Sequence, residues 1–392
     1  MKYFTKGKVI IKSWCNNPEG GAIDQAINLA NHPFIFRQVC LMPDTHQGYG
    51  MPIGGVIGTK GCVIPNAVGV DIGCGMAAVK TSLTEIKTED LKKIMGLIRE
   101  KVPVGFKHHT VEQEHMLMPF DDFDNFNTVN MPVCCTEYRS ALKQLGTLGG
   151  GNHFIEIQKG SDGHIWFMVH SGSRNLGFKV AKHYNNIAIE LNKKWESIVT
   201  KDQELAFLPL DTDEATNYLT EMKYALDFAK ANRNLMVERI KEAFNSVTDN
   251  GVSFEKEINI HHNYARMENH FGANVMIHRK GTTSAKCGEL GIIPGSQGTS
   301  SYIIKGRGNP ESFRSCSHGA GRKMGRKRAQ SSLNLEEEQK RLEDKNIIHS
   351  IRNKGDLDEA SGAYKDIDIV MEEQKDLIDI VVKLEPLGVI KG

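Results

Sequence analysis

Several features are missing from this sequence, and each absence excludes a class of architecture. No apolar stretch reaches the length that a membrane-spanning helix needs. The opening MKYFTKGKVIIKSWCNN lacks the apolar core and the small-residue cleavage site of a secretion signal. No segment repeats at a fixed period, which excludes solenoids and propellers. No stretch has the composition of a linker, so we expect one compact domain over residues 1–392.

Cysteine pairs of the CxxC type are also absent. The eight cysteines are scattered along the chain, a pattern that does not form a disulfide framework in a protein of this size. We therefore expect reduced thiols and a cytoplasmic protein. Most of these cysteines are expected to be small buried apolar residues, and one is a candidate metal ligand.

Three common catalytic motifs are missing as well. The chain has neither the GxxxxGK[ST] loop of P-loop enzymes nor the HExxH motif of zincin proteases. It also lacks the Lys-x-(Asp/Asn)-Gly motif of ligases that use a lysine nucleophile. Any chemistry on phosphates has to come from another set of side chains.

Composition and charge are those of an ordinary soluble protein. Apolar, aromatic and charged residues make up 40%, 7% and 25% of the chain, which argues against disorder and fibres. The net charge is only +1, because basic and acidic residues nearly cancel. Affinity for nucleic acid would therefore require a local basic patch.

Short β-branched runs between glycines dominate residues 36–80 and predict strands joined by tight loops. Residues 152–157, NHFIEI, alternate in a way that places His153, Ile155 and Ile157 on one strand face. Residues 165–170 and 257–262 are predicted strands that each end in histidine. The tail, residues 367–392, is predicted to finish with a pair of apolar strands.

Helical periodicity appears in the middle of the chain. Residues 176–199 and 213–245 are predicted helices, with Asp211 and Glu214 as the signal that begins the second. Residues 335–348 predict a charged helix, for which a solvated face is an equally good interpretation. The sequence therefore predicts an α+β fold with a helical insertion at about 176–248.

Candidate metal ligands lie at loops and strand ends. Asp71 and Cys74 are three residues apart among glycines, in GVDIGCG. His153, His170 and His262 each stand where a strand meets a loop, a place where side chains of a rigid scaffold converge. A lone histidine there is more often a hydrogen-bonded core residue. Five such side chains together favour a transition-metal centre, in which a thiolate bridges two ions about 3.5–4 Å apart. Either Mn²⁺ or Zn²⁺ suits such ligands.

A second candidate lies at His318, in the segment SCSHGAGRKMGRKR (315–328). Its small neighbours give the imidazole little shielding, and Gly319 to Gly321 would allow a phosphate to approach the backbone N–H groups. Basic side chains follow at Arg322, Lys323, Arg326, Lys327 and Arg328. The segment predicts either a nucleophile toward phosphorus or a basic surface turn with an incidental histidine.

Taken in order, a set of segments resembles the RtcB family of RNA ligases. They are GVDIGCG, GGGNHFIEI, VHSGSR, HHNYARME, HRKG, IPGSQGTSSY, SHGAGR, AYKDID and the final IKG. The resemblance runs from about residue 36 to the last residue. It implies a single domain of the family's own fold, with mixed or antiparallel sheets around a metal site. It also implies a ligase dependent on GTP and two Mn²⁺ ions, which joins an RNA 3′-phosphate or 2′,3′-cyclic phosphate to a 5′-hydroxyl.

The resemblance assigns roles to residues. One Mn²⁺ would be held by Asp71, Cys74 and His153, and the second by Cys74, His170 and His262. His318 would take GMP from GTP as a phosphoramidate and pass it to the RNA 3′ end. Arg174 and Lys280 would meet RNA or phosphate. Residues implied to line the nucleotide are Asn152, His153, Phe154, Ile155, Glu156, His262, Asn263, Pro294, Gly295, Ser296, Gln297, Ser301, His318, Gly319, Ala320, Gly321, Tyr364 and Lys391.

Two segments depart from the family pattern. Gly325 stands where serine is frequent, and DTHQGYGMPIGG (44–55) differs from the DVHxGKG version of many members. We expect neither segment to touch a metal ligand or His318, so the chemistry should be kept while RNA selection differs.

Alternative functions are a metal-dependent phosphoesterase or nucleotidyltransferase, and a non-catalytic RNA-binding homologue. The sequence does not specify which RNA is sealed, in tRNA splicing or in repair. It also leaves open whether an activating partner such as archease is needed. Members of the family tend to act as monomers, so the resemblance implies a monomer.

Overall fold

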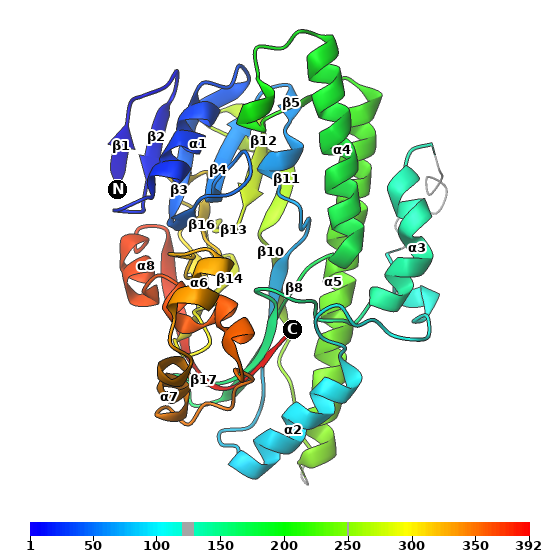
Figure 1. Ribbon diagram of the computed structural model, residues 1–392, viewed down its shortest axis with the longest axis vertical. Coiled ribbons are helices and arrows are strands. Elements are labelled where there is room, and N and C mark those ends of the chain that lie inside the picture. Colours follow the sequence, from blue (N-terminus) through cyan, green and yellow to red (C-terminus); the bar gives the residue numbers. More distant parts are fainter. Residues whose placement is uncertain (120–128, 249–250) are drawn as a thin grey trace.

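The computed structural model describes residues 1–119, 129–248 and 251–392. Two large sheets occupy its middle, and two long helices run side by side along them (Figure 1). The predicted α+β class with mixed and antiparallel sheets is confirmed. No helix in the described ranges is long and apolar enough to cross a bilayer.

The first sheet has six strands, in the order β1-β2-β3-β4-β12-β11. Strands β2 and β3 pair in parallel, and the other neighbours are antiparallel. Two of its strands, β3 and β4, come from the Gly-rich segment 36–80, where strands were predicted. The strands are β1 Lys2–Phe4, β2 Ile10–Ser13, β3 Ile35–His46, β4 Ile53–Thr59, β12 Ala273–Lys280 and β11 Asn263–His270.

The second sheet has seven antiparallel strands, in the order β10-β6-β8-β7-β17-β15-β14. Two small strand pairs, β13 with β16 and β5 with β9, complete the described sheets. The strands of the large sheet are β10 Ile258–His261, β6 Gly75–Lys80, β8 Ile165–Ser171, β7 Phe154–Gly160, β17 Ile378–Lys391, β15 Ser301–Gly306 and β14 Leu290–Ile293. The short strands are β13 Thr282–Ser284, β16 Ser315–Ser317, β5 Cys62–Val63 and β9 Leu208–Pro209.

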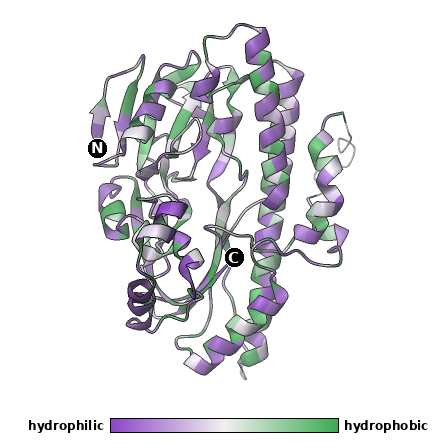
Figure 2. Ribbon diagram, in the orientation of Figure 1, coloured by the Kyte–Doolittle hydropathy of each residue, from purple (hydrophilic) through white to green (hydrophobic). Residues whose placement is uncertain are grey.

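The helices cover these sheets. Along α5, Tyr218, Met222 and Ala229 are buried at helical spacing, as predicted, and Figure 2 shows hydrophilic positions between the hydrophobic ones. The core between α3, α4 and α5 is one of several apolar clusters. The helices are α1 Gly20–Ala30, α2 Thr88–Lys101, α3 Pro132–Gln144, α4 Arg174–Lys194, α5 Asp213–Val247, α6 Arg326–Ser332, α7 Leu335–Glu343 and α8 Ile367–Glu373.

Several predicted boundaries are wrong for local reasons. The N-cap of α5 is Thr212, whose hydroxyl accepts the N–H of Ala215, and the predicted Asp211 signal lies outside it. Helix α7 ends at Glu343 because Asn346 has a left-handed backbone (φ 54°) and Ile347 enters the core. Helix α4 ends at Lys194, five residues before the predicted end at 199.

The C-terminal segment differs most from the prediction. In place of two strands, β17 is one strand of 14 residues that passes through a register shift between Pro386 and Gly388. Its first half pairs with β15 and its second half with β7. A proline and a glycine usually mark a turn, but here they form an irregularity within the strand. The consequence is that Lys391 ends beside Phe154.

Candidate active site

The registers of four neighbouring strands bring the predicted metal ligands to one edge of the seven-stranded sheet. Gly75 on β6 pairs with Ser171 on β8, so Cys74 comes beside His170. Phe154 on β7 pairs with His170, which places His153 at the same edge. His261 on β10 pairs with Gly75, so His262 follows next to Cys74 and donates its N–H to the Cys74 carbonyl at 2.9 Å.

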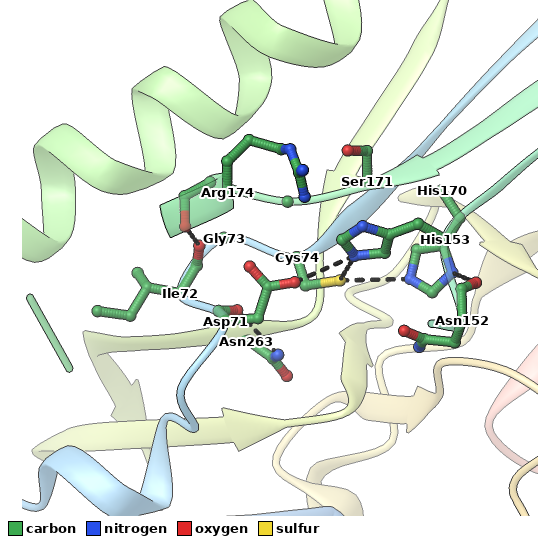
Figure 3. Close-up of polar contacts among 12 residues, drawn as sticks. Asp71, Ile72, Gly73, Cys74, Asn152, His153, His170, Ser171, Arg174 and Asn263 are labelled. Carbon is green, nitrogen blue, oxygen red and sulfur yellow. Dashed lines mark hydrogen bonds and ion pairs between the residues drawn. The ribbon is translucent and has the colours of Figure 1, made fainter. Parts of the chain in front are cut away.

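The side chains of these residues meet around the Cys74 sulfur (Figure 3). Cys74 Sγ lies 3.4 Å from His153 Nε2 and 3.3 Å from His170 Nε2. His170 Nε2 is 3.4 Å from His262 Nε2, and His153 Nε2 is 3.1 Å from Asp71 Oδ2. The five side chains therefore form one continuous cluster, in which Cys74, His153 and His170 have the closeness of a metal-binding group.

Backbone carbonyls fix the orientation of two of these imidazoles. His153 Nδ1 contacts the Leu148 carbonyl and His170 Nδ1 contacts the Asn152 carbonyl, both at 3.0 Å. Since a carbonyl only accepts, each Nδ1 donates a proton and each Nε2 turns toward the sulfur. His153 Nε2 also faces the Asp71 carboxylate. Nitrogen, sulfur and carboxylate oxygen atoms that face one another are a donor set that a cation would hold, so the residues fit a metal.

Burial sets the protonation of the cluster. It lowers the pKa of His170 and of His262 well below the usual range, so both imidazoles are neutral at pH 7. Burial also raises the pKa of the Cys74 thiol, and the neighbouring Asp71 carboxylate raises it further. His262 Nδ1 has no partner among the described residues. Neutral imidazoles are the form that binds transition metals, and a bound cation would favour the Cys74 thiolate.

The His318 imidazole is held by a carboxylate. His318 Nδ1 lies 2.7 Å from Asp44 Oδ2, and the same oxygen accepts the His318 backbone N–H at 3.1 Å. Asp44 is completely buried at the end of β3. The prediction that segment 44–55 would not touch His318 is therefore wrong. The contact arises because the long strand β3 of the six-stranded sheet extends to His46 and so places Asp44 beside His318.

His318 is also more enclosed than its small neighbours suggest, since only 13% of its side chain is exposed. Its ring packs against His262 with the ring centroids 4.8 Å apart. Gly281, with φ at 59°, lies against the ring so closely that a Cβ there would come within 3.0 Å of His318 Cε1. The ring is thus fixed between the metal-type cluster, Asp44 and the turn after β12.

These groups open into one cavity of about 760 Å³. Its wall combines the edge of the seven-stranded sheet, the loop after β14 and the segment that follows β16. The predicted residues that line it are Asp71, Cys74, Asn152, Phe154, Glu156, His170, His262, Asn263, Pro294, Gly295, Ser296, Gln297, His318, Gly319, Ala320, Gly321, Tyr364 and Lys391.

Comparison with known proteins identifies the family. The family described as tRNA-splicing ligase RtcB matches residues 25–392. The chain belongs to the RtcB family. It is 38% identical to the RNA-splicing ligase RtcB of Escherichia coli (strain K12) over 411 aligned residues, which cover 100% of this chain and 97% of that protein.

Archaeal members are also similar to this RtcB-family chain. The tRNA-splicing ligase RtcB of Pyrobaculum aerophilum is 32% identical, and that of Thermococcus kodakarensis is 30% identical. Both alignments cover 94% of this chain and 91% of the archaeal protein. The family predicted from the motifs is therefore confirmed, while the roles of individual residues stay predictions.

Three residues predicted to line the nucleotide are not among those that line the cavity of this RtcB-family protein: His153, which lies in the metal-type cluster, Ile155 and Ser301. Ile155 is 1% exposed and lies in the apolar core together with Ile157, on the face of β7 opposite Phe154 and Glu156. Ser301 is equally buried, and its hydroxyl accepts the Gly295 N–H at 3.1 Å. It supports the loop that lines the cavity instead of lining it.

The two predicted RNA-contacting residues lie in different places. Lys280 lines the cavity, where burial lowers its pKa to about 7 and its Nζ donates to the carbonyls of Tyr49 and Asn66. Arg174 lies beside the Asp71 side of the cluster and donates to Thr147 Oγ1 and to the Gly105 carbonyl (Figure 3). It is not among the residues that line the cavity.

Sequence reasoning missed a second carboxylate, Glu359. This buried side chain pairs with Arg322 and Arg326 at 2.9 Å each and accepts a hydrogen bond from the Tyr364 hydroxyl. The Glu359 backbone carbonyl accepts the Gln297 side-chain amide at 2.9 Å. One acidic residue therefore organises four groups of the cavity wall. The acidic run LDEASG before AYKDID is the signal that could have indicated it.

Two further ionisable residues in the cavity lining are Glu156 and Lys391. Burial raises the pKa of the Glu156 carboxyl to about 8 and lowers the pKa of the Lys391 ammonium to about 8. The two residues are brought close by the β7–β17 register, in which Glu156 pairs with Val389. Lys391 Nζ also lies 5.8 Å from the centre of the Phe154 ring.

Proposed function

We propose that this protein is an RNA ligase that joins an RNA 3′-phosphate or 2′,3′-cyclic phosphate to a 5′-hydroxyl, with GTP as co-substrate and Mn²⁺ as metal. The names of its relatives in bacteria and archaea, RNA-splicing and tRNA-splicing ligase, support the reaction class. The observation that carries the proposal is the convergence, in one cavity, of a carboxylate-held imidazole with a cysteine–histidine cluster.

The Asp44–His318 pair suits nucleophilic attack on phosphorus. An ionised Asp44 accepts the Nδ1 proton, so the lone pair of His318 is on Nε2, on the other side of the ring. That lone pair attacks the α-phosphorus of GTP, an N–P bond forms, and the P–O bond to the departing pyrophosphate breaks. Asp44 also stabilises the positive charge that the imidazole gains as the N–P bond forms.

The two later steps transfer this GMP group to RNA and then release it. An oxygen of the RNA 3′-phosphate attacks the GMP phosphorus, the N–P bond breaks, and His318 returns to its neutral form. The 5′-hydroxyl of the second RNA then attacks the activated 3′-phosphorus, and GMP leaves. Arg322 and Arg326, held by Glu359, supply positive charge to these phosphates.

The metal ligands in this proposal are those predicted from the resemblance. Asp71, Cys74 and His153 would hold one Mn²⁺, and Cys74, His170 and His262 the second. When bound, Mn²⁺ would stabilise negative charge on the phosphoryl groups as a Lewis acid. The protein's own part is to hold the imidazole nitrogens and the thiol in a chain of contacts, each within 3.5 Å of the next, and out of bulk water.

On the nucleotide side, Tyr364 would stack on the base, and Gln297 with Lys391 would hold the guanine and ribose. The Tyr364 hydroxyl donates to the Glu359 carboxylate, which anchors that end of the ring in the cavity wall. We further infer that the enzyme acts in the cytoplasm as a monomer, on RNA from tRNA splicing or repair. Adding archease to the ligation assay tests the need for an activating partner.

The test is incubation with α-labelled GTP and Mn²⁺. We expect a protein-bound label that is labile in acid and stable in base, mapped to His318. The His318→Ala variant should lose the label, whereas His115→Ala should keep it, because His115 is exposed and outside the cavity lining. A label that persists in His318→Ala contradicts the assigned nucleophile.

A second assay distinguishes the ligase from a phosphoesterase. RNA with 3′-phosphate and 5′-hydroxyl ends should be sealed only when GTP is present. Release of inorganic phosphate without GTP, and without joined RNA, would instead support the phosphoesterase alternative.

A further inference from the structure

One partly buried lysine, Lys365, contacts the backbone beside Asp44 and has no role in the chemistry proposed above. Lys365 Nζ donates to the Pro43 carbonyl at 3.1 Å and to the Thr45 carbonyl at 2.5 Å. Its third contact is Cys15 Sγ at 3.6 Å. The ammonium thus bonds to the backbone on both sides of Asp44, and all three of its protons have acceptors.

The side-chain partners of this lysine are two backbone carbonyls and a thiol. Among the described residues, none of its hydrogen-bond partners is a carboxylate. The two backbone carbonyls belong to the residues on either side of Asp44. Hydrogen bonds to them hold the backbone of Asp44 in place and so restrict the position of its side chain. The side chain between them is Asp44.

The same residue also connects Asp44 to the segment that carries the nucleophile. The Lys365 backbone N–H donates to the Gly321 carbonyl at 2.9 Å. Gly321, with φ at 72°, lies so close to Asp44 that a Cβ would come within 2.2 Å of the Asp44 carbonyl oxygen. Gly54 closes the other side, where a Cβ would come within 2.9 Å of Asp44 Oδ1. Lys365 is therefore bonded to both segments that set the Asp44–His318 distance.

We propose that Lys365 is a positioning residue for the nucleophile: its ammonium fixes residues 43–45 so that Asp44 holds His318 in the orientation for attack on GTP. The inference rests on the proposed function, because its readout is the rate of GMP transfer to His318. It assigns Lys365 no contact with nucleotide or RNA.

The first experiment measures single-turnover formation of the labelled protein–GMP adduct over a range of GTP concentrations. Lys365→Met keeps the length of the side chain and removes its charge and donors. We expect its maximal rate to fall by about 10- to 10²-fold, the cost of a small misplacement of reacting groups, while half-saturating GTP changes by less than about twofold. Lys365→Arg, which can donate to both carbonyls, should recover most of the rate.

Lys375→Met is the matched control. Lys375 lies just after α8 and pairs with Glu372 on the surface, and 74% of its side chain is exposed. The Lys375→Met variant loses a lysine ten residues from Lys365 that has no contact with Asp44. Its rate of adduct formation should therefore equal that of the unmodified protein.

A double-mutant cycle with Asp44→Asn tests whether Lys365 acts through Asp44. If it does, Lys365→Met costs about 10- to 10²-fold in the unmodified background and less than about twofold in the Asp44→Asn background. Equal losses in the two backgrounds, or a rise in half-saturating GTP without a change in maximal rate, overturn the inference.

The other outcomes are also decisive. A wild-type adduct rate in Lys365→Met, in a protein that does form the adduct, refutes the role of Lys365 and leaves the proposed function intact. Failure of the unmodified protein to form any adduct refutes the proposed function itself. If Lys365→Met lacks a cooperative thermal transition, Lys365→Gln takes its place in the cycle with the same expected coupling.

Discussion

The histidines of the cavity are anchored in two different ways. His153 and His170 in the metal-type cluster contact backbone carbonyls through Nδ1, each at 3.0 Å. His318 contacts the Asp44 carboxylate through Nδ1, at 2.7 Å. A carbonyl fixes the tautomer and leaves a neutral lone pair, which suits a metal ligand. A carboxylate in addition stabilises a positive charge on the ring, which suits a nucleophile or a base.

The difference also follows the two sheets. The carbonyl-anchored histidines lie on the edge of the seven-stranded sheet, whose registers align them. Asp44 comes from β3 of the six-stranded sheet. The carbonyl-anchored histidines are therefore aligned within one sheet, whereas the nucleophile depends on how β3 of the six-stranded sheet meets the segment that follows β16.

The largest effect is expected from a change in the metal-type cluster. Cys74→Ala removes the ligand that the two ions would share, so Mn²⁺ affinity should fall by more than about 10²-fold and adduct formation should cease. Mn²⁺ binding is measured by electron paramagnetic resonance and calorimetry, without reliance on activity. Cys287→Ser, at an exposed cysteine, is the control and should bind Mn²⁺ normally. Normal binding by Cys74→Ala would contradict the ligand set.

The next largest effect is expected from a change at the Asp44–His318 pair. Asp44→Asn keeps the shape of the side chain but loses the charge and the obligatory acceptor for the His318 Nδ1 proton. We expect adduct formation to slow by about 10³-fold, as when a catalytic histidine loses its carboxylate. Mn²⁺ binding should be unchanged, because the metal-type ligands keep their carbonyl anchors. A parallel loss of Mn²⁺ binding would show that the two regions are not independent.

A smaller effect is expected where the regions touch. Gly281→Ala places a methyl group 3.0 Å from His318 Cε1 and 2.4 Å from Ile53 Cγ2, at a positive φ of 59°. The His318 ring has to shift, and we expect adduct formation to slow by about 10-fold to 10²-fold. Gly61→Ala also has a positive φ, but nothing lies within 4 Å of its Cβ position, so its rate should be normal. An equal slowing in both variants would indicate a general effect on the fold.

The last prediction concerns how the free energy of unfolding depends on pH through Glu156, a residue of the cavity lining. Burial raises the pKa of Glu156 from its ordinary 4.5 to about 8. Between these values the unfolded carboxyl is ionised while the folded one keeps its proton, so rising pH favours unfolding by up to about 1.4 kcal/mol per pH unit. Glu156→Gln should remove this contribution, which denaturant titrations from pH 5 to 9 would measure. An unchanged pH profile in Glu156→Gln would contradict the shifted pKa.

Much of the local structure was predictable. Strands β8 and β10, which end within one residue of the predicted ends at 170 and 262, and the long helix from Asp213 follow from apolar runs and from the helical spacing of apolar residues. The predicted ligands Asp71, Cys74, His170 and His262 do line one cavity. The β17 strand was not predicted, because Pro386 and Gly388 form a register shift there and the signal is the same as for a turn.

Other parts of the site had no local signal. Asp44 precedes His318 by 274 residues, and nothing near either residue indicates that a carboxylate and an imidazole meet. Glu359 lies in the acidic run LDEASG, but nothing there indicates its partners Arg322, Arg326 and Tyr364, because these pairings depend on how η6, Lys354–Glu359, packs on α6. Ile155 was assigned to the nucleotide because its neighbours are there, but a strand sends alternate side chains to opposite faces.

The sequence by itself determined the family, the strands and helices, and the kinds of donor atoms available for a metal, because these depend on short motifs and on the spacing of apolar residues. Only the tertiary structure decided which acceptor each histidine received, and hence which imidazoles are suited to bind an ion and which to attack phosphorus. The reason is that a hydrogen-bond partner is fixed by distance in space, and the registers and packing of the two sheets set those distances between residues far apart in the chain.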